Sequence, residues 1–189
     1  MSTKQATSEL SENQKVTTLV SRVVINGKIE DVWREITKTD EPQLAFFGAQ
    51  MHRLGLQPGS PIRMRTPDAK FTSVVGEILE VDPPNRLSHT MKFTNYDDPY
   101  CTVTYDLKEV DGGVEFTLTS EAVPEGSKTH KSMARGGDFI VKTLKTVIEK
   151  GNAPLATRMI YGLFRVLGPL MTPAVSRSEN WPLETEEAS

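Results

Sequence analysis

The sequence predicts an α+β domain in which a curved antiparallel sheet of about seven strands wraps around one long helix near the C-terminus. The central part of the chain alternates apolar and polar residues with period two, as expected for strands with one buried face. Turn-forming residues separate these runs. Thr129 to Gly151 instead places apolar residues at spacings of three, four and seven, which indicates a helix lying on an apolar surface.

The first elements follow from residue type and spacing. Lys15 to Asn26 is rich in β-branched residues and is expected to form the first strand. Residues 28–38 place their apolar side chains on one helical face, which predicts a short helix. A second short helix is predicted between Asp40, which would cap it, and Gly48, which would end it.

A meander of strands is predicted from residue 50 onward, where the period changes to two. Half-apolar strands of this kind suit an antiparallel sheet with one face in water. Gly76 lies inside one strand and predicts a bulge or bend. The expected strands are 50–55, 61–66, 71–81, 86–93, 100–110 and 114–121.

The long helix carries its own start and stop signals. Gly136 and Gly137 remove side chains where the helix could approach other backbone closely. Lys150 and Gly151 provide a basic last turn and a glycine stop. The apolar stripe that should face the sheet consists of Met133, Ile140, Val141, Leu144, Val147 and Ile148.

Composition excludes several classes of protein. The net charge of −3 argues against a general nucleic-acid binder. Cys101 is the single cysteine, so no intramolecular disulfide can form, and a reducing compartment such as the cytoplasm is expected. The first residues are polar and lack the apolar segment of a secretory signal. No run of eighteen apolar residues predicts a membrane span.

Four regions are predicted along the chain. Residues 1–14 and 179–189 should be tails, the second of them acidic, and residues 15–151 should form the domain. Residues 152–178 form an apolar helical extension without an acidic residue. Its segment 152–171 could pack on its own domain, form a homodimer or bind a protein partner. It could also lie in a membrane interface, a contact less expected than the others.

Three stretches carry a family resemblance that covers roughly residues 15–151. They are IEDVWREITKTDEPQLAFFG (29–48), GEILEVDPPNRLSHT (76–90) and YDDPYCTVTYDLKEVDGGVEFTLTSE (96–121). The pattern resembles the START-like, or SRPBCC, superfamily, and within it the branch similar to activators of the heat-shock-chaperone ATPase. The resemblance implies the helix-grip fold of the birch-pollen allergen, in which a cavity lies between the long helix and the sheet.

The chain departs from that family pattern at the expected cavity mouth. Relatives often carry tryptophan where this chain has Phe46 and Phe47. Many have Gly-Trp at the last helix where this chain has Gly137-Asp138. The ligand of a relative therefore does not transfer to this chain.

Alternation places His89, Met91 and Tyr105 on the face toward the long helix. His89 could bond a ligand or act as a base, or it could be a core histidine satisfied by Tyr105. Core packing is the favoured interpretation for Trp33, whereas Phe46 and Phe47 could form either a gate or core. The expected ligand contacts are Trp33, Phe46, Phe47, Met64, His89, Met91, Tyr105, Phe116, Met133, Ile140 and Leu144.

Catalytic and metal signatures are weak. No catalytic residue is assigned, and His89 with Tyr105 is the one candidate pair. His52, His89 and His130 are scattered, so neither a metal nor a cofactor is expected. A thiol on the apolar strand face, as expected for Cys101, would stay protonated and inert.

Binding of a small apolar or amphipathic ligand is the leading functional hypothesis, and an enzyme is the less favoured class. The first alternative is a stress-related partner-binding protein, as the resemblance to chaperone-ATPase activators implies. The second is a polyketide-cyclase-like or hydrolase-like enzyme that uses His89 and Tyr105.

Overall fold

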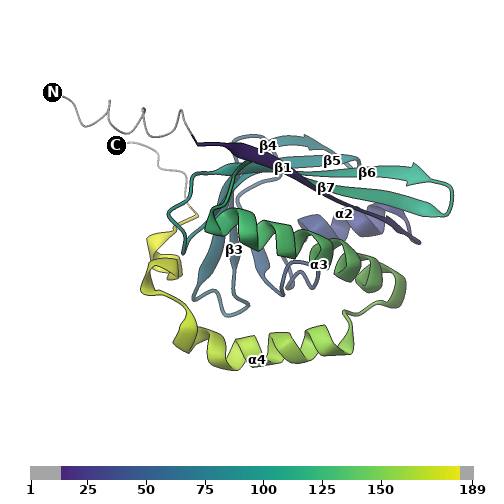
Figure 1. Cartoon of the computed structure of the whole chain (residues 1–189). Coiled ribbons are helices and arrows are strands. Elements are labelled where there is room, and N and C mark those ends of the chain that lie inside the picture. Colours follow the sequence, from purple (N-terminus) through teal and green to yellow (C-terminus); the bar gives the residue numbers. More distant parts are fainter. Residues whose placement is uncertain (1–13, 184–189) are drawn as a thin grey trace.

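The computed structural model describes residues 14–183, except for the side chains of residues 164–167, 169 and 170. It contains the predicted seven-stranded antiparallel sheet, with strand order β1-β7-β6-β5-β4-β3-β2. The strands are β1 (Val16–Ile25), β2 (Gln50–Arg53), β3 (Pro61–Arg65), β4 (Thr72–Asp82), β5 (Arg86–Phe93), β6 (Cys101–Val110) and β7 (Gly113–Pro124). The helices are α2 (Ile29–Thr37), α3 (Lys128–Lys150) and α4 (Leu155–Met171), with 3-10 turns η1 (Ala174–Ser176) and η2 (Ser178–Asn180). The predicted α+β class is confirmed (Figure 1).

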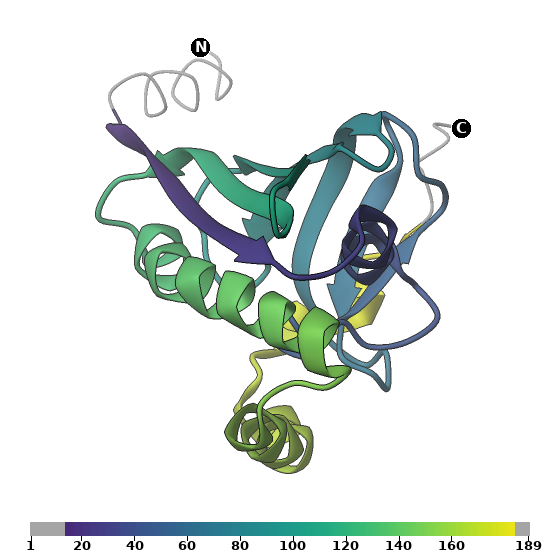
Figure 2. The ribbon, with the colours of Figure 1, turned by 90° about the vertical axis from the view of Figure 1, so that its right-hand side faces the viewer.

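The long helix α3 lies across the curved sheet, and its apolar stripe faces the core. Val141, Leu144 and Val147 are buried, while Met133, Ile140 and Ile148 pack partly buried against the core. Figure 2 shows α3 alongside β1, with α4 beyond it on the far side from that strand. The sheet and α3 therefore form the two walls of the domain.

Specific residues fix where α3 begins and ends. The Ser127 hydroxyl accepts a hydrogen bond from the His130 amide at 2.9 Å. The Asp98 carboxylate accepts one from the Thr129 amide at 2.8 Å. These acceptors satisfy free amides at the helix start, where a negative charge is also favourable. Gly151 adopts a left-handed conformation with φ of 74° and ends the helix.

Gly76 is required by a close approach between two strands. A Cβ atom at this position would lie 1.9 Å from the carbonyl oxygen of Thr90 on β5. The ladder between β4 and β5 shifts register nearby, between Ile78 and Glu80. The register is regular across Gly76 itself, so the bulge expected at this glycine lies instead at Leu79, further along β4.

The predicted second short helix after Asp40 is wrong. Residues 38–49 form turns, and a bridge joins Gln43 to Ala49. Phe47 and Gly48 have φ values of 58° and 70°, which a right-handed helix cannot accommodate. We call this segment, residues 38–49, the mouth loop.

The extension after Gly151 crosses the open side of the domain and then returns to the sheet. The Tyr161 hydroxyl of α4 donates to the carbonyl oxygen of Leu44 in the mouth loop at 2.8 Å. Residues 173–183, which we call the C-terminal strap, pair through Arg177 with Phe71. Residues 179–183 of the predicted acidic tail belong to this strap, and residues 184–189 lie outside the described chain. No helix among residues 14–183 is long and apolar enough to cross a membrane.

Candidate functional site

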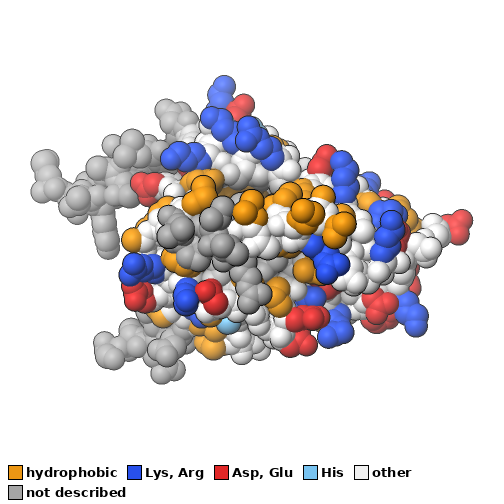
Figure 3. Space-filling model, turned by 90° about the horizontal axis from the view of Figure 1, so that it is seen from below, with side chains coloured by type: hydrophobic (Ala, Val, Ile, Leu, Met, Phe, Trp, Pro, Cys, Tyr) orange, Lys and Arg blue, Asp and Glu red, His pale blue; other side chains and the backbone are white. Residues whose placement is uncertain are grey.

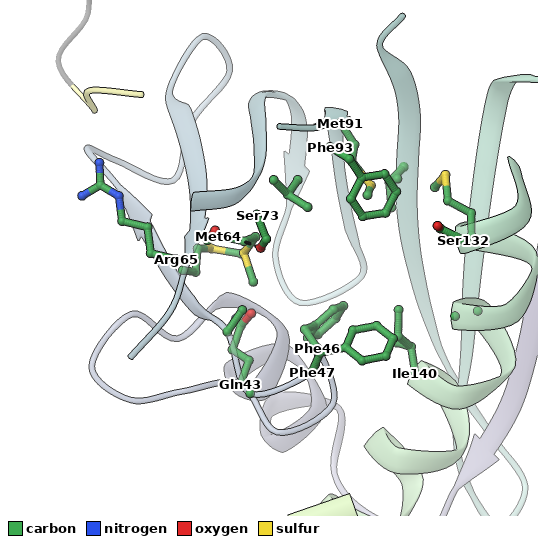
Figure 4. A pocket seen from close by; sticks show the side chains of 18 of the residues that line it. Gln43, Phe46, Phe47, Met64, Arg65, Ser73, Met91, Phe93, Ser132 and Ile140 are labelled. Atoms are coloured by element: carbon green, nitrogen blue, oxygen red, sulfur yellow. Dashed lines mark hydrogen bonds between the residues drawn. The ribbon is translucent and has the colours of Figure 1, made fainter. Parts of the chain in front are cut away.

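A cavity of about 990 Å³ lies between the sheet, α3, the mouth loop and α4. Figure 4 shows side chains of the sheet, α3 and the mouth loop around it, with Phe46 and Phe47 opposite Met64 and Met91. Exposed residues such as Ser73 and Asp138 also line it, so the cavity reaches the surface. Its interior is mainly apolar, with Phe46, Met64, Met91, Phe93, Met133 and Ile140 among the lining residues.

Most of the expected ligand contacts meet at this cavity. The lining residues include Phe46, Phe47, Met64, His89, Met91, Tyr105, Met133 and Ile140.

The structure places Trp33, Phe116 and Leu144 elsewhere. Phe116 and Leu144 are fully buried in the core, and Trp33 packs partly buried against it. Leu144 lies one turn beyond Ile140, where α3 is already seated on the sheet. Phe116 is covered by Tyr105, with ring centroids 5.8 Å apart. Phe116 therefore supports the cavity wall at Tyr105 from behind, and Trp33 and Leu144 belong to the core.

His89 and Tyr105 form a neutral buried pair. His89 is 6% exposed; its Nδ1 lies 2.8 Å from the Thr90 carbonyl oxygen, and its Nε2 lies 3.4 Å from the Tyr105 hydroxyl. Because a carbonyl can only accept, Nδ1 donates and Nε2 accepts from Tyr105. Burial lowers the pKa of His89 and raises the pKa of Tyr105. The histidine lone pair is thus occupied, which is the geometry of a satisfied core histidine.

The two phenylalanines of the mouth loop point in different directions. Phe46 contacts Tyr105 edge to face at 5.6 Å between ring centroids. Phe47 is 52% exposed and stacks on Phe139 of α3 at 4.8 Å. Gly136 of α3 lies beside this ring, and a Cβ there would be in ordinary contact with Phe47, at 3.6 Å. Phe46 therefore forms part of the cavity wall, and Phe47 closes the gap between the loop and α3.

Several lining residues were not predicted from the sequence. Gln43 is fully buried; its Nε2 donates to the Lys38 carbonyl at 3.3 Å, and its Oε1 has no partner within residues 14–183. The Arg65 guanidinium on β3 donates to the Trp181 carbonyl at 3.1 Å. Tyr161 and Thr172 reach the cavity from the extension. No sequence signal marked them, because each position depends on contacts between distant segments.

Reactive groups are scarce around the cavity. In the part of the chain that the structure describes, no three His, Cys, Asp or Glu side chains group in a way that could hold a metal ion. Cys101 is buried, and burial raises the pKa of its thiol to about 11. The thiol is therefore protonated at neutral pH, and it points toward the Met91 carbonyl and the Met133 sulfur.

A curved antiparallel sheet gripping a long C-terminal helix over an apolar cavity defines the START-like, or SRPBCC, class of helix-grip proteins. Within that class, the sequence profile of the family described as Activator of Hsp90 ATPase homolog 1-like protein matches residues 26–149. The chain belongs to this family, and the resemblance found in the sequence is confirmed. The extension from residue 152 lies outside the matched segment.

Solved structures share this fold at low sequence identity. Protein CV1439 from Chromobacterium violaceum is 20% identical with a TM-score of 0.54, and the match covers 70% of this chain and 96% of that one. CalU16 from Micromonospora echinospora is 16% identical with a TM-score of 0.59, covering 83% and 90%. The Aha1 dimer from Colwellia psychrerythraea is 15% identical with a TM-score of 0.57, covering 71% and 98%. Among curated proteins, none matches the sequence.

Proposed function

We propose that the protein binds a small hydrophobic or amphipathic molecule in the cavity between α3 and the sheet. The observation that carries this proposal is the cavity itself, about 990 Å³ with mainly apolar walls. That volume lies at the upper end of ordinary small-molecule sites, at roughly 300 to 1,000 Å³. The cavity also lies where helix-grip proteins hold theirs, between the long helix and the sheet.

The walls indicate what chemistry the ligand should have. Met64, Met91 and Met133 line the cavity, and their flexible thioethers can adapt to ligands of varied shape. Polar lining residues that are exposed, such as Ser73 and Asp138, lie where the cavity meets the surface. We therefore expect an apolar body inside and any polar group of the ligand at the mouth.

The paired state of His89 and Tyr105 supports binding over catalysis. A general base needs a free lone pair near its substrate. The lone pair of the unprotonated ring nitrogen of His89, Nε2, instead accepts a hydrogen bond from the Tyr105 hydroxyl. A cyclase-like or hydrolase-like reaction at this pair would first have to break that contact. We therefore assign the pair to the wall of the cavity.

Native mass spectrometry and thermal denaturation with fatty acids, sterols and aromatic polyketides test the proposal. The expected result is a one-to-one complex with at least one class and a higher Tm. Ile140→Trp should fill the cavity and weaken binding at least tenfold, because Ile140 points into it (Figure 4). Thr146→Trp, on the same helix but outside the cavity lining, is the matched control. A failure of all ligands to bind or to raise Tm would contradict the proposal.

Family membership supports a second candidate, contact with the large heat-shock chaperone whose ATPase gives the family its description. A pull-down with the purified chaperone and an ATPase assay test it. If the full chain stimulates the ATPase and the Ile140→Trp variant stimulates it equally, the partner function is independent of the cavity. Absence of both capture and stimulation would remove this candidate.

A further inference from the structure

Helix α4 exposes several large apolar side chains among those that the structure describes. Tyr161, Gly168 and Thr172 face the cavity, and Thr157 is buried. A surface helix normally turns its apolar stripe toward its own domain. On α4, five large apolar side chains with described positions are instead 47 to 77% exposed: Leu155, Met159, Ile160, Leu163 and Met171.

The exposed side chains of Leu155, Met159, Ile160 and Leu163 form one patch. Residues 155, 159 and 163 are spaced by four, so they line one side of the helix, and Ile160 widens that stripe. Figure 3 shows hydrophobic side chains in a row along the face of the molecule that α4 occupies. Contiguous patches of this kind mark contact surfaces, because leaving them in water is unfavourable.

The segment that carries this patch is rich in cations. Residues 128–178 hold nine lysines and arginines but two acidic residues, Asp138 and Glu149, although the whole chain has a net charge of −3. Lys131, Lys142 and Arg158 are among the exposed cations of α3 and α4. Figure 3 shows Lys and Arg side chains on the surface beside the hydrophobic row, and Asp and Glu side chains are also present on this face. An apolar stripe flanked by cations suits a surface that is apolar inside and anionic outside.

We propose that α4 docks on an anionic lipid bilayer, with its apolar stripe in the interface and the cations of α3 and α4 near the headgroups. A second copy of the chain fits this surface less well, because α4 has no carboxylate to pair with the cations that would meet across a shared interface. The helix is too short and not apolar enough to span, so it lies in the plane of the surface.

Docking would place the cavity beside the bilayer. The other side of α4 supplies Tyr161, Gly162, Gly168 and Thr172 to the cavity lining. A shift of the helix toward lipid would therefore open a path between the cavity and the membrane. This last step rests on the proposed ligand binding, whereas the docking itself does not.

Vesicle flotation of the full chain tests the docking. The chain should float with vesicles of phosphatidylcholine mixed with phosphatidylglycerol, float less with phosphatidylcholine alone, and be released by high salt. Met159→Glu with Leu163→Glu should reduce the bound fraction at least tenfold, because both side chains are exposed on α4. Leu54→Glu with Leu79→Glu is the matched control: these leucines are also exposed, lie outside the cavity lining, and should change nothing.

The remaining outcomes would overturn the proposal. One is that the chain floats with neither kind of vesicle. Another is that the double variant Met159→Glu, Leu163→Glu (the α4 double variant) floats as well as the wild type. If the wild type does not bind vesicles but is a dimer, and the α4 double variant is a monomer, then a second copy of the chain covers the stripe. Native mass spectrometry of the same variants reads ligand binding separately, so a failed docking test and a failed cavity test are distinguishable.

Discussion

The chemistry of single residues is set by burial, and His89 is the clearest case. The lowered pKa of this histidine results mainly from removal of its ring from water. The pKa of His52 is also lowered, first by burial and then by the positive charge of Arg65. Both histidines therefore take up a proton at lower pH in the folded protein than in the unfolded chain.

The first prediction concerns the pH dependence of stability. Because the unfolded chain binds a proton at His89 more readily than the folded one, the free energy of unfolding should decrease as pH falls below the unfolded pKa of about 6.5. One such proton contributes a slope of at most about 1.4 kcal/mol per pH unit. His89→Gln should remove this part of the slope in urea denaturation at pH 7.5 and 5.5, about one unit on either side of that pKa. An unchanged slope would show that His89 does not titrate in this way.

The second prediction concerns Gly76. A Cβ there would lie 1.9 Å from a backbone oxygen, which cannot move without disturbing the ladder between β4 and β5. Gly76→Ala should therefore lower the free energy of unfolding by roughly 2 kcal/mol or more. Gly162→Ala is the control, because a Cβ there meets nothing within 4 Å and alanine favours the helix by roughly 0.5 to 1 kcal/mol. Equal stability of the two variants in urea denaturation would refute the account.

Strand alternation predicted some site residues but not others. Period two fixes which side chains of a strand share a face, so His89, Met91 and Tyr105 could be placed together from the sequence. Gln43 could not, because the conformation of the mouth loop depends on its bridge to Ala49 and on the positive φ of Phe47. Irregular backbone has no period from which a direction can be read.

At the scale of elements, the mouth loop is held by charge as well as by its own turns. The Lys38 ammonium lies 2.7 Å from the Glu35 carboxylate in a buried pair and 3.1 Å from Glu41. Burial raises the pKa of Glu35 despite these contacts, since desolvation outweighs the nearby cation. The pair anchors the loop to α2, and α4 meets that loop through Tyr161.

The third prediction concerns this contact of α4. The Tyr161 hydroxyl donates to Leu44, and burial raises its pKa to about 12, so it stays protonated as a donor. Tyr161→Phe should make the amides of α4 exchange hydrogen faster by roughly three- to tenfold, as expected for the loss of about 1 kcal/mol. Exchange in α3 should not change. Tyr100→Phe, at an exposed tyrosine, is the matched control, and equal α4 exchange in both variants would exclude Tyr161 as an anchor.

At the scale of the whole molecule, the path of the chain after α3 was the least predictable part. The sequence predicted an apolar helix there but left its destination open, because an apolar stripe alone does not identify its partner. The C-terminal strap decides where α4 lies. The Ser178 amide donates to Lys70 at 2.9 Å, and buried Ser176 accepts a hydrogen bond from Thr94 at 2.9 Å. These are contacts between residues about 80 to 110 positions apart, which no local pattern records.

The fourth prediction tests the strap as the second anchor of α4. Deletion of residues 173–189 removes the bonds to Lys70, Thr72 and Thr94, and should cost about 2 to 3 kcal/mol of unfolding free energy. The domain should still unfold in one transition, because the sheet and the core side of α3 are intact.

Deletion of residues 184–189 alone is the control for that truncation, and it should leave stability unchanged. With the strap removed, α4 keeps the contact at Tyr161 but loses its contacts at the other end. Hydrogen exchange in α4 should therefore accelerate relative to α3. This acceleration should be larger than the one caused by Tyr161→Phe. A cavity ligand should also dissociate faster, because α4 lines the cavity. If α4 exchange and ligand dissociation are the same in both truncations, the helix is positioned by the mouth loop alone, and the strap serves only to cover the sheet at β3 and β4.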